Sequence, residues 1–313
     1  MRISIIVPCY NEEETVSLFF NEVEKYKRED DFEYIFIDDG SKDKTLDAIK
    51  ELASNNKYIR YISFSRNFGK EAALFAGLQS STGELVTVMD VDLQDPPELL
   101  PQMIDRISTT DVDCVGTRRS NRKGEPIIRS FFARKFYQLI NKISDTEMVD
   151  GARDFRMMTR QMVDAILELT EYNRFSKGLF SWVGFKTEYI SFENRERVAG
   201  ETSWSFWKLF KYSLEGIINF SDAPLTLSAA VGSFSCIGSV IAMLFIVFRA
   251  LIFGDSTTGW PSLVTIILFI GGIQLLSLGI IGKYIGRIFL ETKKRPIYIS
   301  KETNIDKKTV EGK

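Results

Sequence analysis

A short run of acids closes the most apolar strand that the sequence predicts, within residues 86–97. Asp90 and Asp92 follow a β-branched run typical of a buried strand, and two prolines then stop the strand and open a helix. Because side chains alternate along an extended chain, the two carboxylates are expected on one side of it. Hard oxygen ligands with no His nearby suit Mg²⁺ or Mn²⁺ and suit zinc poorly. The alternative is an acidic strand-to-helix turn, since Asp also caps helices.

Polar side chains also follow two earlier predicted strands. Asn11 and Glu12 come after residues 3–7, and Asp38 and Asp39 come after residues 34–37. In open α/β sheets ligands bind at the carboxyl ends of strands, so carboxylates repeated there fit the ribose and base of a nucleotide. The glycine fingerprint of dinucleotide-binding proteins and the phosphate loop of kinases are both missing, which weakens dehydrogenase and kinase interpretations.

Composition excludes several other classes of protein. The 313 residues contain no His, so Ser-His-Asp, Cys-His and His-metal chemistry are excluded and any base must be a carboxylate. A total of 40 Lys and Arg against 42 Asp and Glu gives a net charge of -2, without the basic surplus of nucleic-acid-binding proteins. The three cysteines, Cys9, Cys114 and Cys236, have neither metal nor redox spacing, which favours a reducing compartment.

Strands and helices alternate through the first part of the chain and would position these side chains. The strands are expected at residues 3–7, 34–37, 61–64, 86–89 and 112–116. Apolar residues recur at helical spacing between them. The alternation predicts an α/β fold, with a Rossmann-like, mostly parallel sheet covered by helices on both faces.

Four ordered motifs resemble those of a known enzyme family. They are residues 8–12 (PCYNE), 38–41 (DDGS), 66–70 (RNFGK) and 90–97 (DVDLQDPP). In this order they resemble the motifs of inverting family 2 glycosyltransferases of GT-A fold. More closely, the chain resembles the polyprenyl-phosphate sugar transferases, which include bactoprenol glucosyltransferases and dolichol-phosphate mannose synthase. The similarity extends from residue 1 to about residue 295 and implies a GT-A nucleotide-sugar-binding fold.

The resemblance implies a donor site and a metal site. Uridine would be held by the first two motifs, Asp90 would lie near the donor ribose or phosphate, and Asp92 with Gln94 would hold Mg²⁺ or Mn²⁺, with Asp90 beside them. The complete set of expected donor-binding residues is Pro8, Tyr10, Asn11, Glu12, Asp39, Ser41, Lys70 and Asp90.

Asp154 is expected to be a catalytic residue. It matches the Asp of the Asp-Phe-Arg segment of the bactoprenol enzymes, which is their proposed base. The alternative is an ordinary ion pair with Arg153 or Arg156. A phosphate monoester has its second pKa near ~6, so a lipid phosphate is largely a dianion at neutral pH. Asp154 is therefore expected to position the acceptor or sugar as much as to take a proton.

Arginines are expected to bind both the diphosphate of the donor and the phosphate of the acceptor. Arg197, with Asp92, completes the expected catalytic set, because it matches an Arg-x-x-Gly-x-Ser loop with one inserted residue and would stabilise the leaving diphosphate. Arg195 is the second candidate for that position. Arg118 and Arg129 best match the residues that hold the acceptor phosphate in the family. They lie in a basic, aromatic stretch that predicts an interfacial helix near residues 127–143, with a solvated surface helix as the alternative. A separate stretch of aromatic and basic residues predicts a second interfacial helix near residues 203–220.

Two apolar stretches, residues 225–248 and 263–281, are each long enough to span a bilayer. Basic residues flank the pair, while the connector at 254–260 has none. The positive-inside rule then places both termini and the catalytic domain in the cytoplasm. The predicted domains are a GT-A domain at 1–220, a two-helix transmembrane domain at 225–290 and a flexible cytoplasmic tail at 296–313.

The resemblance predicts inverting transfer of a hexose from a UDP-sugar to undecaprenyl phosphate at the cell membrane. Glucose or N-acetylglucosamine is favoured, and the β-linked lipid-phosphate sugar would serve cell-envelope glycan modification. Alternatives are another donor or acceptor, or a catalytically idle membrane partner that binds a nucleotide sugar. The Gln-x-x-Arg-Trp motif of processive polysaccharide synthases is missing. The family analogy allows a homo-oligomer such as a tetramer, and no nucleic-acid partner is expected.

Overall fold

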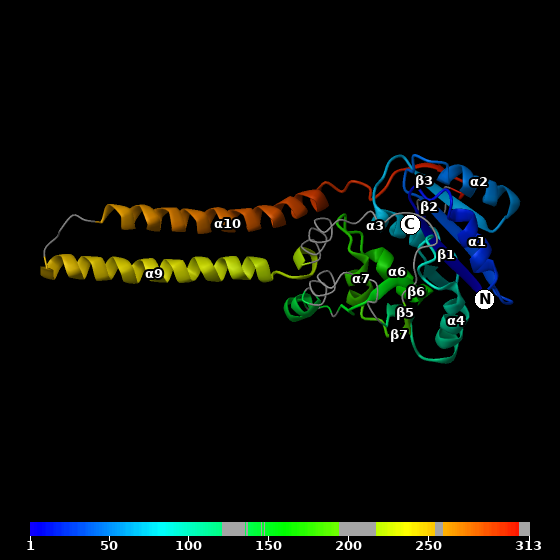
Figure 1. Ribbon diagram of the computed structural model, residues 1–313, viewed down its shortest axis with the longest axis horizontal. Helices are drawn as coiled ribbons and strands as arrows, with labels where there is room; N and C mark the ends of the chain where they lie inside the picture. Colours follow the sequence, from blue (N-terminus) through cyan, green and yellow to red (C-terminus); the bar gives the residue numbers. More distant parts are fainter. Residues whose placement is uncertain are drawn as a thin grey trace.

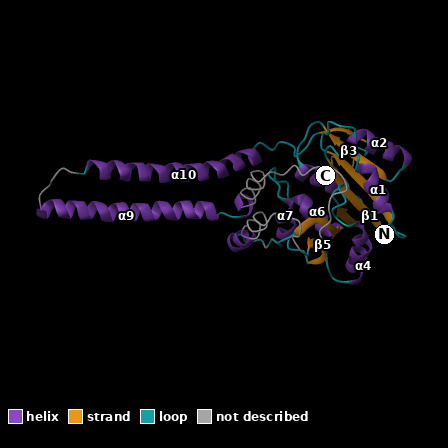
Figure 2. Ribbon diagram, in the orientation of Figure 1, coloured by secondary structure: helices purple, strands orange, loops and turns teal. Residues whose placement is uncertain are grey.

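The protein contains an eight-stranded sheet. The structure is a computed structural model, and it describes residues 1–120, 135, 137–144, 146, 148–193, 217–253 and 259–306. The strands lie in the order β7-β5-β6-β4-β1-β2-β3-β8, and Figure 2 draws the strands in orange among the helices. Their bounds are β1 (Arg2–Cys9), β2 (Asp31–Asp38), β3 (Ile59–Phe64), β4 (Leu85–Val88), β5 (Cys114–Arg119), β6 (Ala152–Thr159), β7 (Thr187–Phe192) and β8 (Ser300–Thr303).

The centre of the sheet is parallel, as predicted. Strands β3, β2, β1 and β4 run parallel to one another, so their carboxyl ends meet at one edge. Strand β6 is antiparallel to β4 and β5, β7 is parallel to β5, and β8 is antiparallel to β3. The sheet is therefore mixed, and the simple alternation of strand and helix ends with β5.

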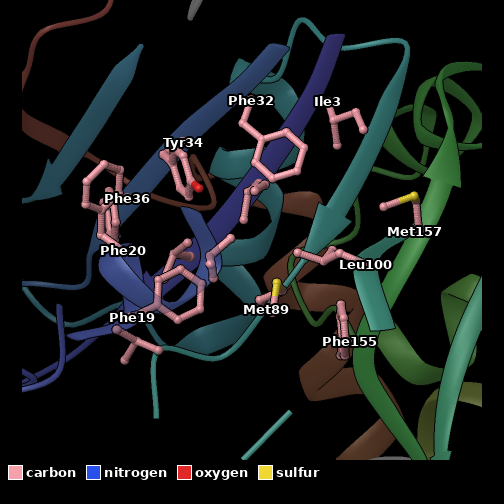
Figure 3. Packing of buried hydrophobic residues seen from close by; sticks show 14 of the residues in the cluster. Ile3, Phe19, Phe20, Phe32, Tyr34, Phe36, Met89, Leu100, Phe155 and Met157 are labelled. Atoms are coloured by element: carbon pink, nitrogen blue, oxygen red, sulfur yellow. The ribbon is translucent and has the colours of Figure 1, made fainter. Parts of the chain in front are cut away.

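Helices cover both faces of the sheet. They are α1 (Val16–Glu24), α2 (Thr45–Asn55), α3 (Lys70–Ser80), the 3-10 turn η1 (Pro97–Leu99) with α4 (Leu100–Thr109), α6 (Arg160–Glu168) and α7 (Ser176–Trp182). Strands β1 and β2 are almost continuously apolar because both of their faces are buried. On one face, Phe19 and Phe20 of α1 pack against the aromatic side chains of β2 (Figure 3).

Two long apolar helices, α9 (Ala223–Phe253) and α10 (Trp260–Thr292), project from the sheet domain side by side (Figure 1). Each is long and apolar enough to cross a membrane, and they cover the two predicted spans. Their large side chains are exposed, as Phe234 at 75% and Leu275 at 72% are. Apolar surface of this extent is typical of a protein that meets a membrane or a partner.

The prediction of a flexible tail from residue 296 is wrong. The chain was expected to be flexible from residue 296, but residues 300–303 form β8 on the outer side of β3. An edge strand presents unpaired backbone groups, and a polar segment can pair with them without an apolar pattern of its own. The sheet domain therefore includes a strand from beyond the second long helix. Most of the two predicted interfacial helices lies outside the described residues.

Candidate active site

The acidic motif lies in a turn. Strand β4 ends at Val88, so Asp90 and Asp92 follow the strand rather than belonging to it, and the alternation of an extended chain does not apply to them. Leu93 adopts a left-handed backbone at φ 56°, which reverses the chain before η1. The backbone N–H of Gln94 donates to Asp92 Oδ1 over 3.1 Å. The expectation that the two carboxylates share one side of a strand is therefore corrected.

Lys70, the first residue of α3, joins Asp90 to Asp154. Its Nζ lies 2.6 Å from a carboxylate oxygen of each acid. Partial burial lowers the pKa of the Lys70 ammonium, but the charges of Asp154 and Asp90 raise it well above its ordinary value. Three elements thus meet at one cation: α3, the turn after β4, and β6.

The same contact keeps Asp154 ionised. Burial raises the pKa of this carboxyl, but the charges of Lys70 and then Lys177 outweigh burial and hold the pKa well below its usual range. The predicted ion pair of Asp154 with Arg153 or Arg156 is not the main contact, because Lys70 takes that place. Asp154 is therefore a carboxylate at neutral pH and a weak base.

Arg153 points to the acidic turn instead. Its Nε donates to Asp95 Oδ1 over 2.8 Å, and its guanidinium approaches Gln94 Oε1 at 3.5 Å. Asp95 is 1% exposed, and burial raises its pKa to about 6 although Arg153 opposes the shift. Arg156 lies over the ring of Phe180 at 3.8 Å and donates to the backbone carbonyl of Arg153. Arg153 of β6 therefore holds the turn that carries the predicted metal ligands.

A second group of side chains lies at the ends of β1 and β2. Asp39 accepts hydrogen bonds from the backbone N–H groups of Phe68 (2.7 Å) and Gly69 (2.9 Å). Burial raises the pKa of Asp39 to about 6, although these two hydrogen bonds lower it. Gly40 has φ +67°, and a Cβ there would lie 2.5 Å from the carbonyl carbon of Arg66, so only glycine lets the two loops approach so closely.

The other predicted donor residues surround this group. Asn11 has φ 54°; its N–H donates to Ser41 Oγ over 3.0 Å, and its side-chain carbonyl accepts from the N–H of Lys42. Glu12 accepts from the Thr15 hydroxyl over 2.8 Å. Asparagine adopts the left-handed region more readily than other non-glycine residues, and the bonds with Ser41 and Lys42 hold Asn11 in it. The remaining two members are Pro8, which pairs with Ile37 inside the sheet, and Tyr10, which is 43% exposed.

Of the arginines predicted to bind phosphate, Arg118 lies within the described residues. Arg118 Nε donates to Ser191 Oγ of β7 over 3.0 Å. Arg129, Arg195 and Arg197 lie outside the described residues.

A contact between Glu71 and Ser176, which was not predicted from the sequence, joins the starts of α3 and α7. Glu71 accepts hydrogen bonds from the backbone N–H and hydroxyl of Ser176, the residue before Lys177. Burial raises the pKa of Glu71, against the Ser176 bonds. This contact fixes the start of α7 against the start of α3, and Lys177 adds a second positive charge near Asp154. Lys70 and Glu71 gave no clear signal in the sequence, because charged residues are common in the first turn of a helix.

A divalent ion fits the acidic turn only if a bound substrate or water supplies further oxygen ligands. Among the described residues, no three His, Cys, Asp or Glu side chains converge as a metal site would require. Mg²⁺ commonly takes one or two carboxylates and completes its shell with substrate phosphates and water. Asp90 is already neutralised by Lys70, and Gln94 Oε1 faces Arg153. Asp92 accepts the bond from the Gln94 N–H and is 6% exposed, so each of the three predicted metal ligands already has a contact within the protein.

Comparison with known proteins agrees with the four motifs. Residues 4–167 match Glycosyl transferase family 2. CsbB of Bacillus subtilis (strain 168) is 46% identical over 98% of this chain and 93% of its own length. The prophage bactoprenol glucosyl transferase homolog of Escherichia coli (strain K12) is 42% identical over 96% of this chain and 99% of its own. The bactoprenol glucosyl transferase of Shigella phage SfX is also 42% identical, over the same shares.

Among solved structures, the glucosyl-3-phosphoglycerate synthase of Mycobacterium tuberculosis has a TM-score of 0.46 and 19% identity, covering 69% of this chain and 77% of that one. The family match and the relatives confirm the family and fold class predicted from the sequence. With a mixed α/β sheet whose strand ends carry the four motifs, followed by two long apolar helices, this chain belongs to glycosyl transferase family 2 and is a glycosyltransferase.

Proposed function

We propose that the protein transfers glucose from UDP-glucose to undecaprenyl phosphate (bactoprenol phosphate). Relatives that share 42% identity over almost the whole chain are named bactoprenol glucosyl transferases, which supports both the sugar and the lipid. The observation that carries the proposal is the Lys70 bridge between Asp90 and Asp154. It joins the residue expected beside the donor to the residue expected beside the acceptor.

The donor would lie along the carboxyl edge of the parallel strands. Asp39 presents a buried carboxylate beside the Phe68–Gly69 amides, where it can accept a hydrogen bond from a uracil or ribose group. Asp90 lies farther along that edge, after β4. This order supports a nucleoside at β1 and β2 and a diphosphate near the acidic turn.

The chemistry would be an in-line displacement. A non-bridging oxygen of the lipid phosphate forms a bond to the anomeric carbon of the sugar, the bond from that carbon to the β-phosphate oxygen breaks, and UDP leaves with the electron pair. The configuration inverts, giving a β-linked lipid-phosphate glucose. No proton has to leave the nucleophile, because a phosphate monoester with a second pKa near ~6 is mostly a dianion at neutral pH.

Asp154 would then act as an orienting charge. Burial raises the pKa of its carboxyl, but the charge of Lys70 outweighs burial and holds the pKa well below the usual range. Asp154 is therefore poorly suited to accept a proton. Lys70 and Lys177 supply the positive charge that lets a lipid phosphate approach this carboxylate. With its side chain 41% exposed, Lys70 can be reached by a ligand.

A bound Mg²⁺ or Mn²⁺ would neutralise charge that develops on the leaving diphosphate. Asp92 would hold it, with Asp90 nearby. The protein's own cations, Lys70 and Arg153, would keep the acidic turn in place around it.

The membrane helices would bring the lipid to this side of the domain. Phe220, just before α9, packs so closely on α7 that a Cβ at Gly178 would lie 2.3 Å from its ring. The Tyr284 hydroxyl of α10 donates to the Ser221 carbonyl over 2.8 Å. Both helices are thereby fixed beside α7, which carries Lys177. The flanking charges support a cytoplasmic domain with both termini inside.

The test is transfer of radiolabel from a panel of UDP- and GDP-sugars into an organic-extractable lipid. Purified protein would be given undecaprenyl phosphate with Mg²⁺, Mn²⁺ or EDTA. We expect a labelled, mild-acid-labile lipid from UDP-glucose, and none from an Asp92→Asn variant that still melts cooperatively. UDP binding without any labelled lipid would favour the idle-partner alternative, and label from another donor would correct the sugar.

A further inference from the structure

The segment that follows α10 returns to the sheet domain, where it lies behind the donor loops. We call residues 296–306 the C-terminal strap. From the end of α10 the chain crosses to β3 at the edge of the sheet (Figure 1). There β8 pairs with Ile62, Ser63 and Phe64 in antiparallel register.

Several polar contacts fasten the strap to β3. Thr303 Oγ1 donates to the Tyr61 carbonyl over 2.7 Å, and Asn304 Oδ1 accepts from the Tyr61 N–H over 2.7 Å. Glu302 forms an ion pair with Lys50 of α2 at 2.7 Å. Ile305 is 5% exposed in the core between the sheet and α3. Contacts from both backbone and side chains make the strap a fixed part of the domain.

A chain of contacts leads from the strap to Asp39. The ring of Tyr298 stacks on Phe64 at 4.9 Å between centroids, and Phe64 meets Phe68 edge to face at 5.7 Å. The N–H of Phe68 donates to Asp39. The Ile299 carbonyl also accepts from the N–H of Ser65, at the start of the same loop. The strap therefore supports the loop whose amides hold the donor carboxylate.

The end of α10 is held at a second point. The carboxylate of Glu291 accepts hydrogen bonds from the backbone N–H groups of Tyr172 (3.1 Å) and Asn173 (3.3 Å). This loop leads directly into α7 and Lys177. The end of α10 therefore contacts the loop that leads to Lys177, on the proposed acceptor side. The strap that follows α10 contacts the proposed donor side.

We propose that the C-terminal strap is a positioning element for the nucleotide donor, with Tyr298 as its positioning residue. It would set the 65–69 loop, and through it Asp39, from the end of the second membrane helix. The inference rests on the proposed donor pocket at Asp39. It gives a role to a segment that lies outside the four motifs.

The test replaces the ring of Tyr298. Tyr298→Ala and Tyr298→Leu both remove the stack on Phe64, and Tyr298→Leu keeps most of the apolar volume. Tyr298→Phe keeps the ring and removes only the hydroxyl that donates to Gln79 Oε1 over 3.0 Å. UDP affinity would be measured by calorimetry in detergent, and donor and acceptor KM by the radiolabel assay.

We expect both ring-deleting variants to raise the Kd for UDP and the donor KM about tenfold, with the acceptor KM within about twofold of wild type. Tyr298→Phe should behave as wild type. The matched control is Tyr58→Ala, which removes a ring that packs with Phe20 and Tyr34, away from the 65–69 loop. It should lower the melting temperature without changing the Kd.

Three results would overturn the inference. The first is a wild-type Kd in a folded Tyr298→Leu protein. The second is an equal rise in the Kd for Tyr58→Ala, which would indicate general loosening of the domain. The third is a wild-type protein that binds no UDP, which would overturn the proposed donor and the inference that rests on it. The first two leave the proposed function intact.

Discussion

Asp39→Asn is expected to stabilise the protein at neutral pH while it weakens donor binding. Asp39 is 4% exposed, and burial raises the pKa of its carboxyl from 3.8 to about 6. Keeping it ionised therefore costs folding free energy, although two backbone N–H groups donate to it. Asparagine has nearly the same shape and carries no charge.

The size of the effect follows from the shift. About two pKa units at roughly 1.4 kcal/mol each make the ionised Asp39 cost about 3 kcal/mol above pH 7. Asparagine offers one acceptor oxygen, so one N–H loses its partner at a cost of about 1–2 kcal/mol. The net gain at pH 7.5 is about 1–2 kcal/mol, which corresponds to roughly 2–6 °C in melting temperature.

The sign depends on pH. Because the folded pKa is raised, the native state takes up a proton as pH falls from about 6 toward 4, and the cost of the charge fades. At pH 4.5 it is down to about 1 kcal/mol, so the variant should then be no more stable than wild type.

Thermal unfolding in detergent, followed by tryptophan fluorescence at pH 4.5 and 7.5 at one scan rate, measures the difference. Asp164→Asn, at a 62% exposed side chain on α6, is the control and should give the same small change at both values. UDP affinity should fall about tenfold in Asp39→Asn. A variant equally destabilised at both pH values would refute the burial argument.

Three further predictions test other parts of the molecule. Replacing Lys70 with Met removes the cation between Asp90 and Asp154, and we expect kcat to fall about a hundredfold or more while Lys70→Arg retains measurable turnover; unchanged kcat in the Met variant would exclude the bridge from the reaction. Asp92→Asn should abolish metal-dependent transfer and leave UDP binding in EDTA unchanged, and normal transfer would rule out Asp92 as the metal ligand. Glu33→Gln breaks a buried network at the amino ends of the strands and should cost about 3 kcal/mol of stability with no change in UDP affinity, whereas a parallel loss of affinity would contradict the separation of the two ends of the sheet.

The strand ends that form the proposed donor edge could be predicted because their sequence signal is local. Apolar runs that end in polar residues identify β1, β2 and β4, and a parallel sheet brings their carboxyl ends together. Asn11, Asp39 and Asp90 all follow such ends. The orientation of Asp90 relative to Asp92 could not be predicted in the same way, because the alternation of side chains stops where β4 ends at Val88.

The contacts that complete the site are non-local, and sequence alone does not reveal them. Lys70 lies 20 residues from Asp90 and 84 from Asp154 along the chain, so their meeting depends on the whole sheet. Strand β8 reaches β3 across about 240 residues, and its four residues, Ser300–Thr303, carry no apolar pattern. Backbone pairing at a sheet edge requires none.

The direction of β6 explains why Asp154 belongs to this site. Opposite residues of β4 and β6 keep a constant sum of numbers, from Leu85 opposite Thr159 to Val88 opposite Arg156. Asp90 and Asp154 each lie two residues beyond that last pair, and Lys70 contacts both of them. A parallel β6 would bring its last residues to the carboxyl edge and carry Asp154 to the far end of the sheet. The antiparallel strand therefore brings Asp154 to the edge where we propose that the nucleotide binds, and Lys70 joins it to Asp90 across the boundary between the two strand directions.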